Sequence, residues 1–494
     1  MLKNIYIESL LFLLFLLGSC QKELLHPIPE SILTTSNAYN TSKDINLAVL
    51  GIYDDLQSRV PTDFVLMEAP SDNAWATSYA TAPGIGQINN LTVSVDNPGL
   101  NDFWKNTYNG IFRANTVLAN INNPTDYTGT QKDQYTGEAK FMRALFYFDL
   151  VRIFGGVPAI TSVITANEAK KIPRATEQDI YDAIVNDLED AVTKLPKPSG
   201  IEYGRASKGA AVALLAKVYV YLKDWNNAKK YLDELFSSEF SYSLVTNYAS
   251  LFLIATEKNS ESIFSLPYVE GTDGQTLTSS MAPAGGVYQT IAGGNTNIRP
   301  TWSLRTSFEE GDSRFPVTIN EEHFPYVYKQ GDPAIWYPFF KKWVVPTANQ
   351  TSSGLDIPLL RLADMVLLNA EVLYNLNQQQ QALDQINLIR ERAFGNPSHD
   401  YLIADISSPE LFMDKLLLER RLELANENNR WFDLVRTGRF TTVLQNIKAD
   451  YNSPTGDGII IKAVHAEPYM KYFPIPNEQI QLANPGVLIQ NEKY

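Results

Sequence analysis

The sequence predicts a mainly α-helical fold, in which tetratricopeptide-like helical hairpins form a scaffold for a large loop-rich region with little β-structure. A pattern of small and apolar residues recurs at 216–228 and 370–382, and more weakly at 144–156. Between the copies at 216–228 and 370–382, residues 256–355 are rich in Gly, Pro and aromatic side chains. A structureless insert of this length in a compact fold is usually functional.

The two stronger copies match at the same small positions. AKVYVYLKDWNNA (216–228) and AEVLYNLNQQQQA (370–382) share Ala at position 1, Val at 3, Leu at 7 and Ala at 13. Each pattern is typical of a helix, a short polar turn and a second helix that begins near the last alanine. Small residues let paired helices approach closely, and about three stacked hairpins bury a continuous core. ALFYFDLVRIFGG (144–156) would supply the third hairpin. Chance similarity between amphipathic helices is the alternative.

The first twenty residues, MLKNIYIESLLFLLFLLGSC, indicate export. The apolar run from Leu10 to Leu17 is too short to span a bilayer, which takes about 20 apolar residues, but it fits a cleaved signal peptide. Cys20 is the only cysteine and follows small residues, as in a bacterial lipobox, where the thiol is acylated. An ordinary signal peptide that contains a cysteine is the alternative. We expect a signal peptide over 1–19 and a lipid anchor and tether over 20–40.

The rest of the chain, 41–494, is expected to form a single domain. It divides into an N-terminal helical part (41–255), the loop-rich ligand-side insert (256–355) and a C-terminal helical part (356–494). Apolar residues at helical spacing predict helices over 42–60 and 103–121, with loops over 61–100. Short strands are expected at Ser262–Pro267 and Tyr337–Val345.

Composition and motifs exclude several classes of function. A net charge of −14 with an isoelectric point near 4.9 argues against a nucleic-acid partner. The four histidines are far apart, and no dinucleotide, P-loop, serine-elbow or EF-hand motif occurs. We therefore expect no metal, no cofactor and no catalytic residue. A glycosidase needs only two carboxylates, so Glu309 and Asp312 leave that alternative open.

The densest charged stretch is ERRLELANENNRWFDLVRTGRF, which begins at Glu419. If it is one continuous helix, Glu419, Glu423 and Glu427 fall on one face. Such a stripe could be acid–base machinery or a structural ion-pair network. Arg420 and Arg430 lie three residues from Glu423 and Glu427, and they would keep the carboxylates ionised, which makes poor proton donors. We expect a structural network.

Five segments in order, together with the lipobox, resemble the SusD/RagB family of surface nutrient-binding lipoproteins. The segments are EAKFMRALFYFDLVRIFGGVP (138–158), RASKGAAVALLAKVYVYLKDW (205–225), ALDQINLIRERA (382–393), LLLERRLELANENNRWFDLVRTG (416–438) and YFPIPNEQIQLANPGVLIQN (472–491). The fourth has Asn429 where the family usually has a glycine, and we expect a local change at that turn.

The resemblance implies a non-enzymatic protein at the cell surface, anchored in the outer membrane through Cys20. It would capture an oligosaccharide and pass it to a SusC-like TonB-dependent transporter. Relatives that bind peptides make a peptide the alternative ligand. Sugar rings stack on aromatic side chains, and polar groups bind their hydroxyls. The candidate ligand residues, from the early loop and the insert, are Trp75, Tyr79, Tyr288, Trp336, Asp72, Asn73 and Arg299. A glycosidase that uses Glu309, Asp312 or the glutamate stripe is the third hypothesis.

Overall fold

The computed structural model describes residues 38–77, 80–283, 294–321, 334–346, 351–445, 447–449, 455–456, 460–462 and 464–494, and the strand segments 287–288, 291–292 and 323–325. The predicted signal peptide, Cys20 and most of the tether lie outside these residues. Within them, the structure has no helix that combines the length and the apolar character needed to cross a bilayer.

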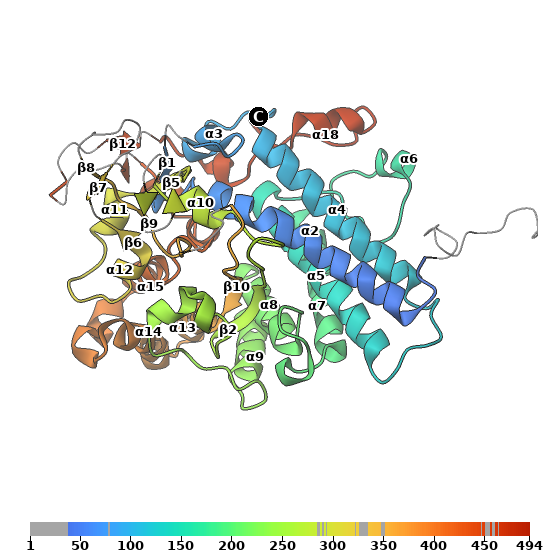
Figure 1. The fold of residues 1–494 in the computed structure, drawn as a ribbon, viewed down its shortest axis with the longest axis horizontal. Helices are drawn as coiled ribbons and strands as arrows, with labels where there is room; N and C mark the ends of the chain where they lie inside the picture. Colours follow the sequence, from blue (N-terminus) through green and yellow to red (C-terminus); the bar gives the residue numbers. More distant parts are fainter. Residues whose placement is uncertain are drawn as a thin grey trace, which may run out of the picture.

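The scaffold is a series of helices that pack side by side in chain order (Figure 1). Its first members are α2 (Ser42–Glu68), α4 (Pro98–Asn120), α5 (Gln131–Phe154) and α7 (Glu177–Lys194). They are followed by α8 (Lys208–Tyr221), α9 (Trp225–Leu235), α13 (Leu362–Asn375), α14 (Gln379–Phe394) and α15 (Pro409–Glu423). The predicted mainly helical fold is confirmed.

The two stronger repeat copies form the hairpins α8–α9 and α13–α14, and their turns have the same geometry. The eighth residue of each copy is left-handed, with φ of 57° at Lys223 and 62° at Asn377. The next backbone N–H donates to the carbonyl five residues earlier, from Asp224 to Tyr219 at 3.0 Å and from Gln378 to Leu373 at 2.9 Å. This bond defines a Schellman C-cap.

The third copy, 144–156, was wrongly expected to form a tight hairpin. Helix α5 runs to Phe154, and the helix that packs against it, α7, begins only at Glu177. A loop and the short helix α6 (Ala166–Ala169) fill the interval. The pair still stacks on its neighbours, so the scaffold is continuous without a third short turn.

Helix α2 is longer than expected, because it continues through Pro61 to Glu68. The helical spacing of apolar residues that predicted this helix corresponds to its buried face, since Ile45, Val49, Ile52 and Leu56 are at most 1% exposed. The predicted loop over 61–100 is wrong for 61–68, and the rest of that range contains β1, α3 and the first residues of α4.

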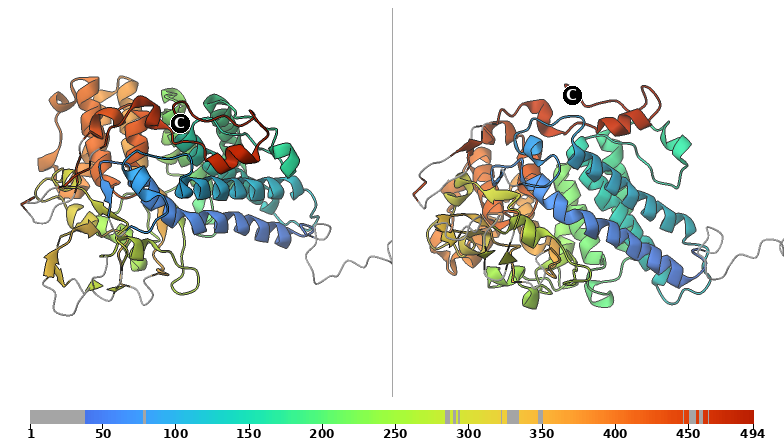
Figure 2. Two further views of the ribbon diagram at one scale, coloured as in Figure 1. Left: turned by 90° about the horizontal axis from the view of Figure 1, so that it is seen from above. Right: turned by 45° about the horizontal axis from the view of Figure 1, so that its top comes forward.

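The insert forms small two-stranded antiparallel sheets and short helices on one side of the molecule (Figure 2). Across the described residues, the strand pairs are β1 (Ala74–Ala76) with β5 (Ile298–Pro300), β2 (Ser262–Leu266) with β10 (Ile357–Arg361), β3 (Val287–Tyr288) with β4 (Ile291–Ala292), β6 (Ile319–Asn320) with β9 (Phe339–Phe340), β7 (His323–Pro325) with β8 (Ala334–Trp336), and β11 (Ile447–Lys448) with β12 (Ile461–Lys462). Strands β1, β10, β11 and β12 come from outside the insert. The strand expected at 262–267 is therefore present as β2. Only Phe339–Phe340 of the range expected at 337–345 is a strand.

The remaining α-helices of the described residues are short, and α16, which follows α15, is the longest of them with seven residues. They are α3 (Ile85–Asn89), α10 (Leu277–Met281), α11 (Trp302–Arg305), α12 (Phe315–Thr318), α16 (Arg430–Arg436), α17 (Phe440–Val443) and α18 (Asn477–Leu482). We call residues 69–97, between α2 and α4, the early loop. Its helix α3 lies beside α2 and β1, and β1 pairs with β5 of the insert. The early loop and the insert therefore meet at the end of α2.

Candidate functional site

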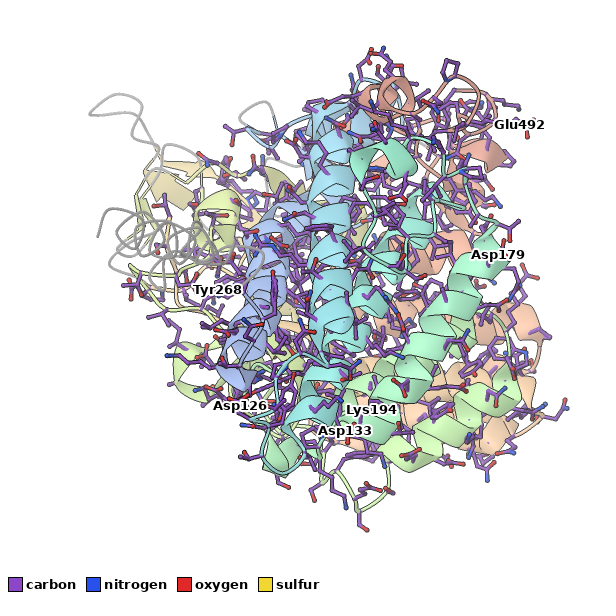
Figure 3. All side chains as sticks on the ribbon, turned by 90° about the vertical axis from the view of Figure 1, so that its right-hand side faces the viewer. Asp126, Asp133, Asp179, Lys194, Tyr268 and Glu492 are labelled. Carbon is purple, nitrogen blue, oxygen red and sulfur yellow. The ribbon has the colours of Figure 1, made fainter. Side chains whose placement is uncertain are left out.

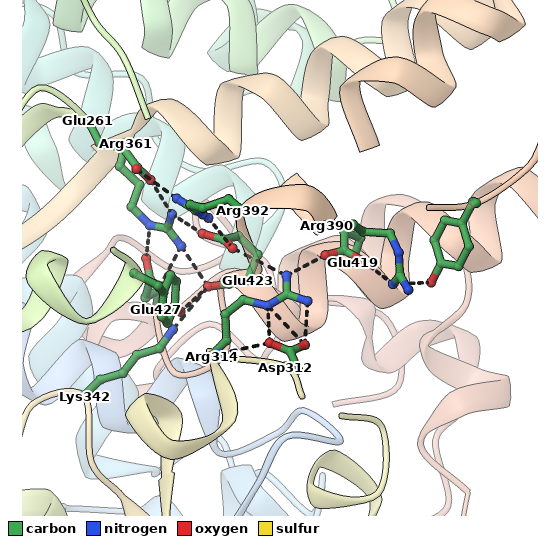
Figure 4. A network of polar contacts seen from close by, with 12 residues as sticks. Glu261, Asp312, Arg314, Lys342, Arg361, Arg390, Arg392, Glu419, Glu423 and Glu427 are labelled. Carbon is green, nitrogen blue, oxygen red and sulfur yellow. Dashed lines mark hydrogen bonds and ion pairs between the residues drawn. The ribbon is translucent and has the colours of Figure 1, made fainter. Parts of the chain in front are cut away.

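The glutamate stripe is a buried ion-pair network between the scaffold and the insert (Figure 4). Helix α15 ends at Glu423, and Asn426 and Asn428 have φ of 58° and 60°. The chain therefore turns before Glu427, and the expected continuous helix is wrong. Asn429 has φ of −110°, a conformation that needs no glycine.

Each carboxylate of the stripe has cationic partners from other segments. Glu419 accepts hydrogen bonds from Arg314 at 2.5 Å and from Arg390 at 3.1 Å. Arg361 donates to Glu423 at 2.5 Å and to Glu427 at 2.7 Å. The structural reading of the stripe is confirmed.

The pKa of Glu423 argues against a general acid at this position of the stripe. Burial raises that pKa, but the guanidinium groups of Arg392, Arg361 and Arg314 lower it well below its ordinary value. The nearby arginines named in the sequence bind elsewhere: Arg420 pairs with Asp364 and Asp433, and Arg430 pairs with Asp72.

The other two glycosidase candidates join the same network. Glu309 contacts Arg390 at 2.8 Å and His399 at 3.1 Å. Burial raises the pKa of Glu309, but these two partners lower it below its ordinary value. Asp312 is buried and accepts from Arg314 at 2.7 Å. Both carboxyl groups thus have cationic partners, and those of Glu309 favour its ionised form.

A separate cleft of ≈ 530 Å³ lies where the early loop meets the C-terminal segment. We call it the β1 cleft, and its volume falls within the range of small-molecule sites. It is lined by Trp75, Ala76, Thr77, Ala80, Ile85, Gly86, Asn89, Asn90, Thr92, Ile460, Ile461 and Lys462. Among the described residues that line it, none carries a carboxyl group.

Trp75 is the aromatic residue of this lining. It is half-buried in β1, directly opposite Arg299 of β5 in the antiparallel register. Opposed residues project from the same face of a sheet. Within the described part of the chain, Nε1 of Trp75 is buried and has no acceptor. An indole N–H usually finds a partner when it is buried, and the described residues supply none for this one.

Arg299 connects Trp75 to the insert. It is 6% exposed, its Nε donates to the carbonyl of Pro338 at 2.9 Å, and its guanidinium lies 4.4 Å from the centre of the Tyr337 ring. Trp336, which directly precedes Tyr337, is half-buried at the end of β8. Arg299 is thus positioned to support the strands, and three of the expected site residues fall in neighbouring segments.

Asp72 and Asn73 face the interior, so the expectation that they contact ligand directly requires correction. Asp72 is 2% exposed and accepts from Arg430 at 2.7 and 3.0 Å. Asn73 is fully buried, donates to Glu68 at 2.8 Å and accepts from Arg421 at 2.8 Å. Their polar groups are used to hold the turn that leads into β1.

Two other expected ligand residues cannot be placed at the cleft. Tyr79 lies outside the described residues, and Tyr288 is described only as part of strand β3. Cys20, the expected lipidation site, also lies outside the described residues.

Four polar residues at or beside the cleft were not predicted from the sequence: Asn89, Asn90, Asn297 and Lys462. Asn297 Oδ1 accepts from the backbone N–H groups of Thr81 and Ala82 at 2.6 and 3.2 Å, which holds the early loop against the insert. Asn89 Oδ1 accepts from Ala76 N at 2.8 Å, and its Nδ2 donates to exposed Asn90.

Lys462 is the fourth missed residue. No motif marks these four positions, although the Asn-Asn pair at 89–90 is a weak polar signal.

Among the described residues, no group of three or more His, Cys, Asp or Glu side chains could hold a metal ion.

Known proteins resemble the chain in sequence and in fold. Two family models match it, the SusD family over residues 329–494 and a family described as starch-binding associating with outer membrane over residues 30–220. SusD-like protein P38 of Formosa agariphila is 30% identical over 508 residues, which cover 93% of this chain and 95% of that protein.

Solved structures show the same fold. A SusD-like protein from Bacteroides fragilis has a TM-score of 0.78 at 23% identity, with 93% of this chain and 99% of that chain covered. A laminarin binding SusD-like protein has a TM-score of 0.75 at 25% identity, with 92% and 100% covered. The full-length identity to the Formosa protein and the two family matches show that this chain belongs to the SusD/RagB family.

Proposed function

We propose that the protein binds an oligosaccharide in the β1 cleft without hydrolysing it. The observation that carries the proposal is Trp75, whose ring lines the cleft and whose Nε1 has no acceptor within the described part of the chain. Carbohydrate rings present apolar C–H faces to aromatic side chains and hydroxyl groups to polar ones. The half-buried indole suits the first need, and the polar groups of the lining suit the second.

The rest of the lining supports this chemistry. Ile460 and Ile461 are 51% and 45% exposed and can cover an apolar sugar face. Within the described residues, the Asn90 amide accepts from Asn89 but donates to no partner, so its N–H groups can reach sugar hydroxyls. Hydrolysis needs a pair of carboxyl groups, and the described lining has none. Trp336, on the neighbouring insert strand, would extend the aromatic surface.

The relatives support the same ligand class. One family model is described as starch-binding, and one similar structure binds laminarin. Both named ligands are uncharged glucans, and the described lining of the β1 cleft has a single charged residue, Lys462.

The family and the first twenty residues support a proposal for the place of the protein in the cell. We infer that residues 1–19 are removed, that Cys20 is acylated and that 20–40 tether one domain, 41–494, to the outer surface of the outer membrane. There it would receive the sugar and pass it to a SusC-like TonB-dependent transporter. The description of the matching family as associating with outer membrane supports this arrangement.

The test is calorimetric titration of the mature protein with uncharged and acidic oligosaccharides and with peptides. The proposal expects binding of at least one uncharged oligosaccharide, no release of reducing ends on prolonged incubation, and co-purification of a barrel transporter from native membranes. Binding confined to peptides would replace the sugar ligand, and release of reducing ends would make the protein an enzyme.

A further inference from the structure

Lys462 has an unusual environment for a lysine beside a solvent-accessible cleft. It is only 4% exposed, and its Nζ donates to the backbone carbonyls of Ala69, Ser71 and Ala74 at 2.7, 3.0 and 3.1 Å. An ammonium group has three protons and no acceptor. Each proton of Lys462 is therefore used by a backbone carbonyl.

These three carbonyls belong to the turn that directly precedes Trp75. Helix α2 ends at Glu68, and β1 begins at Ala74. Lys462 therefore joins the two ends and the middle of this turn from a strand nearly 400 residues later in the chain. A hydrogen bond to a charged group contributes more to stability than one between neutral groups, so three of them strongly restrain the turn.

The strand that carries Lys462 is itself held in place. Strand β12 pairs with β11, and Ala449 N donates to Ile460 O at 2.9 Å. The carbonyl of Ala449 accepts from Trp302 N at 2.8 Å, which attaches the hairpin to the insert. The position of the ammonium is thus set by elements outside the turn that it binds.

We propose that Lys462 is the positioning residue of the β1 cleft: by binding three backbone carbonyls it fixes the turn 69–74 and so places the Trp75 side chain for ligand contact. This inference rests on the proposed function, because it gives Lys462 a role in the same site. It assigns no direct ligand contact to the ammonium, whose protons are already used.

The inference has a consequence for pH. A neutral amine donates only two hydrogen bonds, so loss of the proton releases one carbonyl of the turn. Burial lowers the pKa of Lys462 to about 7, whereas the nearby carboxyl groups of Asp72 and Glu68 act in the opposite direction. Arg421 and Arg430 face the same region through their ion pairs with Asp72. Ligand affinity should therefore fall as pH rises above about 7.

The test compares Lys462→Met with Lys448→Met in the full mature chain. Lys448 is an exposed residue of β11 in the same hairpin, which makes it a matched control. We expect Lys462→Met to weaken binding of the oligosaccharide found in the panel at least about tenfold, a change of about 1.4 kcal/mol. Between pH 6 and 8.5 (the assay range) wild-type affinity should decline, the variant should show a flat profile, and Lys448→Met should behave as wild type.

Hydrogen exchange separates this inference from the proposed function. Amide protons of Asn73 to Thr77 should exchange at least about tenfold faster in Lys462→Met than in wild type, with α8 unchanged. If the wild type binds no oligosaccharide, the proposed function fails, and unchanged exchange or an unchanged affinity in the variant overturns the role of Lys462. Should Lys462→Met fail to fold, Lys462→Gln, which removes the charge but keeps polar donors, takes its place, and unchanged exchange at Asn73 to Thr77 in that variant overturns the role.

Discussion

The hydroxyl group of Tyr268 donates a 2.8 Å hydrogen bond to the carbonyl oxygen of Gln57, four residues before Pro61 in α2. Tyr268 is labelled in Figure 3. In a helix this carbonyl would accept from the N–H of residue 61, which proline lacks. Tyr268 is 7% exposed, so it supplies the missing donor from the insert. The contact explains how α2 continues through a proline up to the turn that carries the site.

We expect Tyr268→Phe to lower the free energy of unfolding by about 0.5–1.5 kcal/mol, because the part-buried carbonyl of Gln57 loses this donor. Pro61→Ala restores a backbone donor, so the cost of Tyr268→Phe should shrink in that background. Urea unfolding of the four proteins of this cycle measures the coupling. Equal costs in both backgrounds would contradict the pairing of Tyr268 with the proline gap.

The Trp75 indole should dominate ligand affinity. Trp75→Ala removes the ring, and we expect a loss of about 1–3 kcal/mol, by analogy with other stacked rings. Trp75→Phe keeps an aromatic face but removes the Nε1 donor, so its loss should be smaller. Trp225→Ala is the matched control, since Trp225 is also half-buried but begins α9 in the scaffold. Titration calorimetry gives the affinities, and equal losses for Trp75→Ala and Trp225→Ala would remove Trp75 from the site.

Arg361 should be the most sensitive residue of the ion network in Figure 4. It donates to Glu261, Glu423 and Glu427, and all of these side chains are at most 3% exposed. Arg361→Met keeps the aliphatic volume but leaves buried carboxylates without this partner, so we expect a loss of about 3–5 kcal/mol in unfolding free energy.

The control for the network is the exposed ion pair of Arg439 with Asp414. Exposed pairs contribute about 0–1 kcal/mol, so Arg439→Met should change stability little. Chemical denaturation measures both variants. Comparable losses at Arg361 and Arg439 would show that burial does not set the cost.

Asp63 should make stability depend on pH. Arg59 contacts the carboxyl groups of both Asp63 and Asp149. Burial raises the pKa of Asp63 to about 7, with Arg59 lowering it and Asp149 raising it further. The ordinary value is about 3.9, so between about pH 4 and 7 the folded chain binds more protons than the unfolded chain. The stabilisation from this group is full below about pH 4 and is lost as pH rises to about 7.

We therefore expect the free energy of unfolding to decrease from pH 5 to pH 7.5 in wild type. Asp63→Asn should make that slope shallower, and burial of Glu68 and Glu257, which also raises their pKa to about 7, accounts for the remainder. The exposed Asp133, labelled in Figure 3, provides the control, because Asp133→Asn should retain the wild-type slope. Urea titrations across this assay range measure the effect. A slope that is unchanged in Asp63→Asn would assign it to other groups.

Some elements of the fold could be predicted from the amino-acid sequence, and others could not. The hairpins α8–α9 and α13–α14 were predictable, because their small residues and polar turn lie within thirteen consecutive positions. The continuation of α2 beyond Pro61 was not, since the donor that replaces the proline N–H comes from Tyr268, 211 residues away. The glutamate stripe was correctly read as ion-paired, but its partners were not the adjacent arginines.

Some residues of the candidate site could likewise be predicted from the sequence, and others could not. Trp75 stands out in a Gly/Pro/Ser-rich loop, and the structure places it in the lining of the β1 cleft. Asp72 and Asn73 stood beside it in the sequence and seemed equally available, but the turn directs both into the interior, toward Arg430 and Arg421. Neighbouring residues in a turn can point to opposite sides, and sequence does not report which.

The family, the mainly helical scaffold and the repeat turns can be predicted from the amino-acid sequence, because they depend on contacts between residues close in the chain and on extended motifs. The three-dimensional fold is needed to know which polar groups face the cleft and which are buried. Arg361 and Glu423 are 62 residues apart, and Lys462 reaches a carbonyl 393 residues earlier. Such contacts depend on how distant segments pack, and no local spacing or propensity encodes them.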